Sequence, residues 1–379
     1  MEPSLDFDLL ELPLFNDDDR AFAADLDARA ADHSWPDPEI DDAAALRSAL
    51  ATLAEWGTLK HTVSEPWRLT TNVLARETLA YHSGIADLAY VMQILGGVPV
   101  MLMGAPELKA DVLPKVVSGE IPTAFAITEP EAGSDLSMMT STATRAGDDY
   151  ILRGVKHLVS NVGVASHFSL FARTSEGPKG VSAFWVPVDA TGMSIELQRP
   201  TSPHPLGILK MDGVRIPATS RLGEEGDGMK LGLMTLERCR TTVAAAACGF
   251  ARRALDEALN HANSRRMFGG TLASQPLAQA MIAEMQARLD ESRMAVYRAA
   301  FEFDRGAPRI TRLASQAKWR ATENAQWVID QAVQLAGGLG VLHGSIFERL
   351  YREIRPLRIY EGATEVQKLV IGRGVVSSQ

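Results

Sequence analysis

The stretch FAITEPEAGSD, residues 125–135, marks the point where the sequence changes from a helical to a strand-like pattern. Before it, alanine-, leucine- and glutamate-rich segments extend from about residue 16 to 115, and Asn16 and Asp17 are candidate N-caps. After it, to about residue 222, short runs such as YILRGVKHLVS (150–160) alternate with turns rich in Gly, Pro and Asp. The helical period then returns. We therefore expect a β domain inserted between two helical regions.

These changes predict an α+β fold that is mostly α. Its expected parts are an N-terminal helical domain with an acidic arm (1–122), a central β domain (123–228) and a C-terminal antiparallel four-helix bundle (229–379). Strands and helices do not alternate as in a Rossmann unit, and neither GxGxxG after a strand nor a GxxxxGK phosphate loop occurs. A cofactor that carries phosphate must therefore be recognised by other devices.

The charge is unevenly distributed along the chain. The 379 residues carry a net charge of −9, but residues 1–42 hold fourteen acidic side chains against Arg20 and Arg29, a charge of −12 that leaves about +3 for the rest. No basic tract is long enough to bind a nucleic acid, whereas the body can accept an anionic ligand. The acidic start also differs from a secretory signal, so we expect a cytoplasmic protein whose acidic arm covers the surface or contacts a partner.

Two further features argue against a membrane span and a metal site. The uncharged run at 88–106 is interrupted by polar, glycine and proline residues, which predict a buried helical segment, a turn and a second segment. They are Gln93, Gly96, Gly97, Pro99 and Gly104. Cys239 and Cys248 lie nine residues apart, a spacing that suits neither a zinc site nor a CxxC pair, so both are expected in the core. The eight histidines form no HxxxH or HExxH pair, so a metal site has little support. No GxSxG motif is present, which argues against a serine hydrolase.

Three polar, glycine-containing segments are candidate ligand sites. The loop at 125–135 can present backbone N–H groups and hydroxyls to an anion or a ring edge, although an ordinary turn into a β domain has the same composition. RRMFG (265–269) suits a diphosphate, or equally a basic helix C-terminus. QLAGGLG (334–340) has three glycines where one suffices for a helix cap, which indicates close backbone approach or a tight interhelical turn.

Glu361 stands in YEGATE (360–365), directly before an expected helix. An isolated carboxylate at such a place commonly interacts with the positive end of the helix. It can also act as a catalytic base if apolar neighbours and a bound substrate raise its pKa towards neutrality. On the residues alone, both interpretations stay open.

Taken together, five motifs in this order resemble the acyl-CoA dehydrogenase family of flavoproteins, over about residues 69–374. The motifs are AITEPEAGSD (126–135), LERCRTTVAAAACGFARRALDEA (236–258), RRMFG (265–269), QLAGGLG (334–340) and RIYEGATEVQ (358–367). The resemblance implies that FAD binds without a Rossmann unit, between the β domain, the C-terminal bundle and a neighbouring subunit. It therefore implies a homodimer or a homotetramer.

The resemblance also assigns residues, position by position. Glu361 matches the carboxylate that removes the substrate α-proton, and the positions implied to lie by the substrate are Arg240, Tyr360 and Gly362. Positions in the β domain that match flavin contacts are Phe125, Ile127, Thr128, Gly133, Ser134, Leu158 and Ser160. Positions in the helical region that match FAD contacts, some of them across the subunit boundary, are Arg265, Phe268, Gln279, Gln334, Gly337, Gly338, Thr364 and Glu365.

The implied reaction is the oxidation of an acyl thioester, on coenzyme A or on an acyl carrier protein, to a trans-2-enoyl thioester. Glu361 would take the α-proton, flavin N5 would take the β-hydride, and an electron-transfer flavoprotein or another acceptor would reoxidise the flavin. Leu158 departs from the family, which commonly has Trp against the flavin. An oxidase that passes electrons to oxygen therefore stays open, and a flavin-containing binding protein without turnover is the alternative from another class.

Overall fold

The computed structural model describes residues 7–177 and 179–377, which form two compact units. The first unit contains residues up to 34, residues 68–87 and the chain from 237 onward. The second unit contains residues 35–67 and 88–236. The division into three domains at residues 122 and 228 rests on local sequence patterning and stays a prediction.

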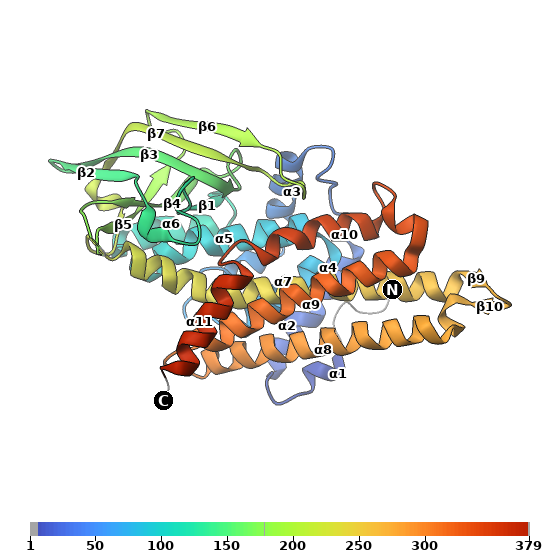
Figure 1. Ribbon diagram of the computed structural model, residues 1–379. Coiled ribbons are helices and arrows are strands. Elements are labelled where there is room, and N and C mark those ends of the chain that lie inside the picture. The colour runs from blue at the N-terminus through green and yellow to red at the C-terminus, as the bar shows by residue number, and fades with distance from the viewer. Residues whose placement is uncertain (1–6, 178, 378–379) are drawn as a thin grey trace. The chain divides into compact units, whose positions relative to one another are not determined.

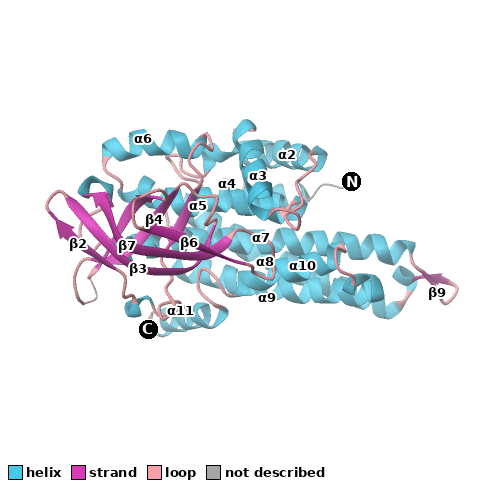
Figure 2. Ribbon diagram, turned by 90° about the horizontal axis from the view of Figure 1, so that it is seen from above, coloured by secondary structure: helices cyan, strands magenta, loops and turns pink. Residues whose placement is uncertain are grey.

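Antiparallel helices make up most of the first unit. In chain order its helices are α1 (Phe7–Leu10), α2 (Asp17–Asp32), α4 (Leu69–His82), α7 (Gly228–Ser264, from Glu237 onward), α8 (Pro276–Asp304), α9 (Thr311–Ala336), α10 (Ile346–Ile354) and α11 (Thr364–Val376). Its short connections are the hairpin β9 (Arg266–Met267) to β10 (Gly270–Thr271) and the 3-10 turns η4 (Leu272–Ser274), η5 (Gly337–Val341) and η6 (Arg355–Arg358). From α7 to α10 successive helices run in opposite directions (Figures 1 and 2), which confirms the predicted bundle.

Residues 7–34 of the acidic arm are built into the first unit. Helix α2 begins at the predicted N-cap Asn16, whose side chain accepts from the Asp19 amide at 2.9 Å while the Asp19 carboxylate accepts from the Asn16 amide at 3.1 Å. The buried Asp19 also pairs with Arg68 at 2.8 Å, and Asp27 contacts His82 of α4 at 2.9 Å. The arm therefore covers α4 through α2, rather than standing free of the fold.

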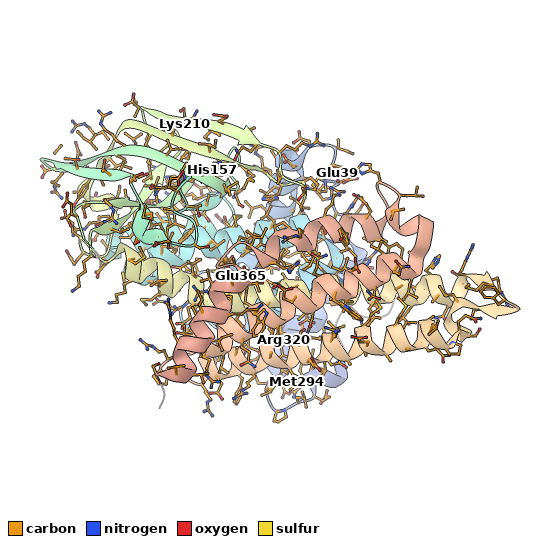
Figure 3. All side chains as sticks on the ribbon, in the orientation of Figure 1. Glu39, His157, Lys210, Met294, Arg320 and Glu365 are labelled. Carbon is orange, nitrogen blue, oxygen red and sulfur yellow. The ribbon has the colours of Figure 1, made fainter. Side chains whose placement is uncertain are left out.

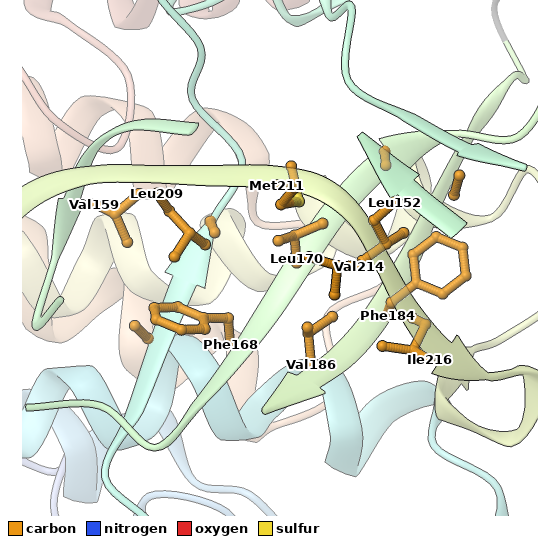
Figure 4. Close-up of a cluster of buried hydrophobic side chains, with 14 of the residues drawn as sticks. Leu152, Val159, Phe168, Leu170, Phe184, Val186, Leu209, Met211, Val214 and Ile216 are labelled. Atoms are coloured by element: carbon orange, nitrogen blue, oxygen red, sulfur yellow. The ribbon is translucent and has the colours of Figure 1, made fainter. Parts of the chain in front are cut away.

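A twisted, largely antiparallel sheet forms the centre of the second unit. Its strands are β1 (Thr123–Ala126), β2 (Thr142–Ala146), β3 (Asp149–Ser160), β4 (His167–Arg173), β5 (Val181–Pro187), β6 (Met193–Gln198), β7 (Leu206–Pro217) and β8 (Arg221–Leu222). Their order is β6-β7-β3-β2-β4-β5-β8, and β1 pairs in parallel with β4. Alternate residues fill one core, including Leu152, Phe168 and Phe184 (Figure 4). Strand β2, TATRA, was not predicted because its short polar run resembles a loop.

Together with residues 228–236 of α7, three helices and three 3-10 turns complete the second unit. They are α3 (Asp42–Glu55), α5 (Gly84–Met103, from Leu88 onward), α6 (Pro106–Val117), η1 (Thr58–His61), η2 (Leu136–Met138) and η3 (Ala218–Ser220). Within the described residues, α5 is the one helix that is long and apolar enough to cross a membrane, but 89% of that stretch is buried inside the protein. The predicted burial of this run is thus confirmed.

The predicted break within residues 88–106 occurs at Gly104, because α5 ends at Met103 and α6 begins at Pro106. No turn forms at Gly96, Gly97 or Pro99, which lie inside α5. Its glycines permit close packing instead of a turn. A Cβ on Gly96 would lie 2.4 Å from the Thr123 side chain, and one on Gly97 would lie 2.5 Å from Val63. The Gly96 carbonyl also accepts from the Ser169 hydroxyl at 2.7 Å. These contacts join α5 to the sheet of the second unit.

Candidate active site

Glu361 lies in a strained turn between η6 and α11 of the first unit. Its φ is 53°, a left-handed conformation that a residue with a Cβ rarely adopts, and Gly362 follows with φ 96°. A Cβ on Gly362 would lie 2.2 Å from the side-chain nitrogen Nε2 of Gln367, and the positive φ also disfavours a Cβ, so glycine is needed here. The surrounding contacts must therefore hold the Glu361 main chain in place.

Helices α9 and α11 supply these contacts. The Gly362 carbonyl accepts from Lys318 Nζ at 2.8 Å and from Gln367 Nε2 at 2.9 Å. One turn further along α9, the Glu323 carboxylate accepts from the Thr364 hydroxyl at 2.7 Å and pairs with Arg358 at 2.7 Å. The turn is thus fastened to α9 before and after Glu361.

The Glu361 carboxyl group is held in a low-dielectric environment. Its Oε2 atom is buried and has no hydrogen-bond partner among the described residues. Burial raises the pKa of Glu361 to about 7, and the positive charges of Arg76, Lys318 and Arg240 limit that rise. Near neutral pH the group therefore exchanges a proton readily, as a general base must.

Arg76 of α4 forms a buried ion pair beside this carboxyl group. Its guanidinium donates to both Asp87 oxygens, at 2.7 and 2.6 Å, and to the Thr242 hydroxyl at 3.1 Å. Burial alone would lower the pKa of Arg76, but the Asp87 carboxylate outweighs it, so the pKa is raised and the charge is kept. The Tyr360 side chain lies next to this guanidinium.

The predicted substrate-side residues therefore come together around Glu361. Arg240 on α7 is 7% exposed, and its Nε lies 3.4 Å from the Glu361 carbonyl oxygen. Tyr360 and Gly362 flank the base in sequence.

Sequence reasoning missed the residues Arg76, Asp87, Lys318, Glu323 and Gln367. A charged residue in a helical stretch is normally solvated, and only a break in the apolar stripe could have pointed to them.

In the second unit, a buried ion pair shapes the loop that follows β1. Glu129 pairs with Lys156 of β3 at 2.7 Å and accepts from the Thr140 amide at 2.7 Å and the Ser141 amide at 3.1 Å. Burial would raise the pKa of Glu129, but Lys156 and these donors lower it to about 2. The Thr128 carbonyl accepts from the His157 amide at 2.9 Å, so the loop is held against β3 from both sides.

The flavin-side residues predicted in the β domain all lie on this loop or on β1 and β3. Leu158 is 53% exposed at φ 54°, and a Cβ on Gly133 would meet no atom within 4 Å. Ser160 is half-buried, with its hydroxyl 3.5 Å from His204 Nε2. The remaining placements are a half-buried Phe125 against Phe171, a buried Ile127, a half-buried Thr128 and an exposed Ser134. An exposed apolar side chain beside hydroxyls and open backbone fits a planar, amphipathic ring such as flavin.

The predicted diphosphate and cross-subunit residues gather towards one end of the bundle, where α7 turns into α8 and α9 into α10 (Figures 1 and 2). Phe268 is 87% exposed at φ 47°, and Arg265, Gln279, Gln334, Gly337 and Gly338 are exposed as well. A Cβ on Gly337 or Gly338 would meet nothing within 4 Å. Exposed guanidinium, amide and backbone groups fit an anionic ligand.

Thr364 and Glu365, the two remaining positions predicted to contact FAD, lie at the start of α11. The Thr364 hydroxyl is engaged by Glu323, while Glu365 is exposed in the first turn of the helix (Figure 3). Their assignment to FAD contacts stays a prediction.

Cys239 and Cys248 are free and buried, which confirms them as core residues.

Family models match two segments of the chain. The model described as acyl-CoA dehydrogenase, C-terminal domain, matches residues 226–376, and the model for the middle domain matches residues 124–214. Cyclohexane-1-carbonyl-CoA dehydrogenase of Geobacter metallireducens is 35% identical, covering 80% of each chain. The caffeyl-CoA reductase-Etf complex subunit CarC of Acetobacterium woodii is 35% identical over 79% of this chain and 80% of its own.

Solved structures share the fold. Butyryl-CoA dehydrogenase from Megasphaera elsdenii superposes with a TM-score of 0.89 at 28% identity, covering 96% of this chain and 99% of its own. A structure described as the FAD complex of PigA also reaches 0.89, at 25% identity and the same coverage. Several independent likenesses thus agree on one fold.

Proposed function

Because the chain belongs to the acyl-CoA dehydrogenase family, we propose that it is an FAD-dependent dehydrogenase in which Glu361 removes the α-proton of an acyl thioester. As a member it is an oxidoreductase that acts on CH–CH groups. The observation that supports the role of Glu361 is its buried Oε2, which has no partner within the described chain, together with a pKa near 7. A carboxyl group whose only task is to stabilise a helix N-terminus stays ionised in water and keeps hydrogen-bond partners.

The groups around Glu361 support removal of a weakly acidic proton. The proton passes from the α-carbon to the Glu361 carboxylate, and negative charge develops on the thioester. Arg76, Arg240 and Lys318 lie around this point, and the Asp87 carboxylate is bound to Arg76, so the positive charge of Arg240 and Lys318 favours the developing anion. When bound, FAD supplies the acceptor for the β-hydride, and the product is a trans-2-enoyl thioester.

The residues that would hold FAD fall into two sets. Exposed Leu158, the open backbone at Gly133 and the hydroxyls of Thr128, Ser134 and Ser160 suit the ring and the near phosphate. Arg265, Phe268 and the glycines of η5 suit the diphosphate and adenine of a second subunit, as the family resemblance implies. A homodimer or homotetramer is therefore part of the proposal.

The relatives suggest the substrate and the electron acceptor. Two of them act on coenzyme A thioesters by name, and one belongs to a complex with an electron-transfer flavoprotein. We assign this chain an acyl-CoA substrate, with an acyl-carrier thioester as the alternative, and an electron-transfer flavoprotein as acceptor. A cytoplasmic location agrees with two free cysteines.

Anaerobic bleaching of the bound flavin tests the proposal. A panel of acyl-CoA and acyl-carrier thioesters is mixed with the wild type, with Glu361→Gln and with the exposed control Glu107→Gln on α6. We expect at least one thioester to bleach the wild type and the control, and Glu361→Gln to be slower by a factor of about 100 to 10,000. Equal rates for wild type and Glu361→Gln would exclude Glu361 as the base, and a flavin that no thioester reduces would favour a binding protein without turnover.

An oxidase on the same fold is the second candidate. It is favoured by Leu158, which is 53% exposed and stands where the family commonly has Trp. A smaller side chain at this place leaves more room for oxygen beside the flavin. In stopped flow, a dehydrogenase reduced by its substrate reacts slowly with oxygen while product is bound, whereas rapid reoxidation under those conditions would identify an oxidase.

A further inference from the structure

Lys318 of α9 is a buried cation that lacks an ionic partner within the described part of the chain. Its side chain is 0% exposed, and it forms no ion pair with any residue between 7 and 377 that the structure describes. Its ammonium group donates to the Gly362 carbonyl, at 2.8 Å. Burying an ammonium group against a neutral acceptor costs free energy, so its presence beside a turn of unusual conformation calls for a reason.

The geometry gives Lys318 a place in the proposed reaction. The carbonyl that it binds belongs to the residue directly after Glu361, in a turn with φ values of 53° and 96°. We propose that Lys318 is a positioning residue: its ammonium fastens the turn that presents Glu361, and its charge stands beside the carboxylate that takes the proton. This inference rests on the function proposed above.

Gln367 separates the two parts of this role. It donates to the same Gly362 carbonyl at 2.9 Å and is equally buried, but it carries no charge. Loss of either donor weakens the attachment of the turn. Only loss of Lys318 also removes a positive charge.

Other charged and titratable groups that face Glu361 come from four elements: Arg76 on α4, Asp87 at the start of α5, Arg240 and the Cys239 thiol on α7, and the neighbouring Tyr360 hydroxyl. Glu323 on α9 and Glu365 on α11 face Lys318. Arg76 is largely neutralised by its bidentate contact with Asp87. Burial lowers the pKa of Lys318 to about 8. The Lys318 charge is thus present near pH 7. Of the three cations Arg76, Arg240 and Lys318, only Lys318 loses its charge when the pH rises to between 8 and 9.

The test compares Lys318→Met with Gln367→Met, which are both unbranched, uncharged replacements of buried side chains. Each variant is loaded with FAD and reduced anaerobically, from pH 5.5 to 9, by the acyl-CoA that bleaches the wild type fastest. We expect both variants to be slower by a factor of about 10 to 100, because the base is less well placed. Lys318→Met should also move the pH of half-maximal reduction upward by about one unit, because removal of a cation favours the protonated Glu361.

Melting temperature and FAD content distinguish this role from a purely structural one. Lys318→Met removes a buried charge, so its melting temperature should equal or exceed that of the wild type. If Lys318→Met does not retain FAD, Lys318→Gln, which keeps a donor but loses the charge, should show the same upward pH shift.

The inference would be overturned if the pH profile of Lys318→Met and Lys318→Gln were not shifted. It would also be overturned if Gln367→Met showed the same upward shift as Lys318→Met. Failure of the proposed function gives a different result. In that case no thioester reduces the flavin of the wild type, or the flavin of Glu361→Gln is reduced as fast as that of the wild type.

Discussion

At the scale of single residues, Glu361 combines two properties that are costly to the fold. Its main chain is left-handed, and its carboxyl oxygen Oε2 is buried without a partner among the described residues. Each of these costs on the order of 1 to 3 kcal/mol, and such features persist where the surrounding contacts over-determine them. Here Lys318, Gln367 and Glu323 provide those contacts.

The pH dependence of flavin reduction follows from the Glu361 pKa of about 7. The base acts in its ionised form, so the rate should be low near pH 5.5 and rise through about pH 7 to a plateau. A solvated glutamate, with a pKa of about 4.3, would give a flat profile over this range. Single-turnover reduction by stopped flow measures the rate at each pH. A rate independent of pH from 5.5 to 8 would contradict the assignment of the base.

At the scale of elements, the close approach of α4 and α7 positions two walls of the site. A Cβ on Gly249 of α7 would lie 2.2 Å from the Glu77 carbonyl oxygen on α4. The Glu77 carboxylate in turn accepts from Arg293 at 2.7 Å and from the Tyr297 hydroxyl at 2.6 Å, both on α8. The glycine thus lets α4, with Arg76, lie directly against α7, with Arg240.

Gly249→Ala should therefore destabilise the protein, by about 1 to 3 kcal/mol, because backbone must move to admit one methyl group. Gly372→Ala on α11 is the matched control, because a Cβ there meets nothing within 4 Å. Alanine at this helix position should be neutral or stabilise by up to about 1 kcal/mol. Melting temperatures of both variants decide the matter, and a Gly249→Ala protein as stable as Gly372→Ala would show that the helices are not closely packed.

Several elements follow from local patterning, and the exceptions have identifiable causes. The run at 150–160 forms β3 as predicted. Strand β2 escaped prediction because its pairing with β3, rather than its own composition, makes it a strand. The glycines of α5 suggested a turn, but their role is contact with Thr123 and Val63, residues that are distant in sequence.

At the scale of the whole molecule, exposed apolar side chains at one end of the bundle suggest a second copy of the chain. Phe268 is 87% exposed, Leu277 82%, Val341 71% and Leu342 58%. Arg265 and Gln334, which the family resemblance assigns to FAD of a partner subunit, are exposed in the same segments. Apolar surface of this kind commonly marks an interface.

We expect light scattering after gel filtration to show a dimer or a tetramer. Val341→Asp should shift the protein towards smaller species and lower its FAD content, because a charge is costly to bury at an interface. Ile40→Asp, at an even more exposed apolar position (86%) in the second unit, serves as the control and should keep the wild-type mass. A wild-type monomer that retains FAD would exclude a composite site between subunits.

Local sequence was sufficient for the main parts of this protein. Periodicity predicts the helical and β regions, and the motif RIYEGATEVQ singles out Glu361 as a candidate base. The tertiary structure alone decided that Arg76, Asp87 and Lys318 surround that carboxyl group and that its Oε2 has no partner among the described residues. The physical reason is that a charged side chain in a helical sequence looks the same whether water or protein surrounds it. Burial, and with it the shift of a pKa, arises only when segments far apart in the chain pack together.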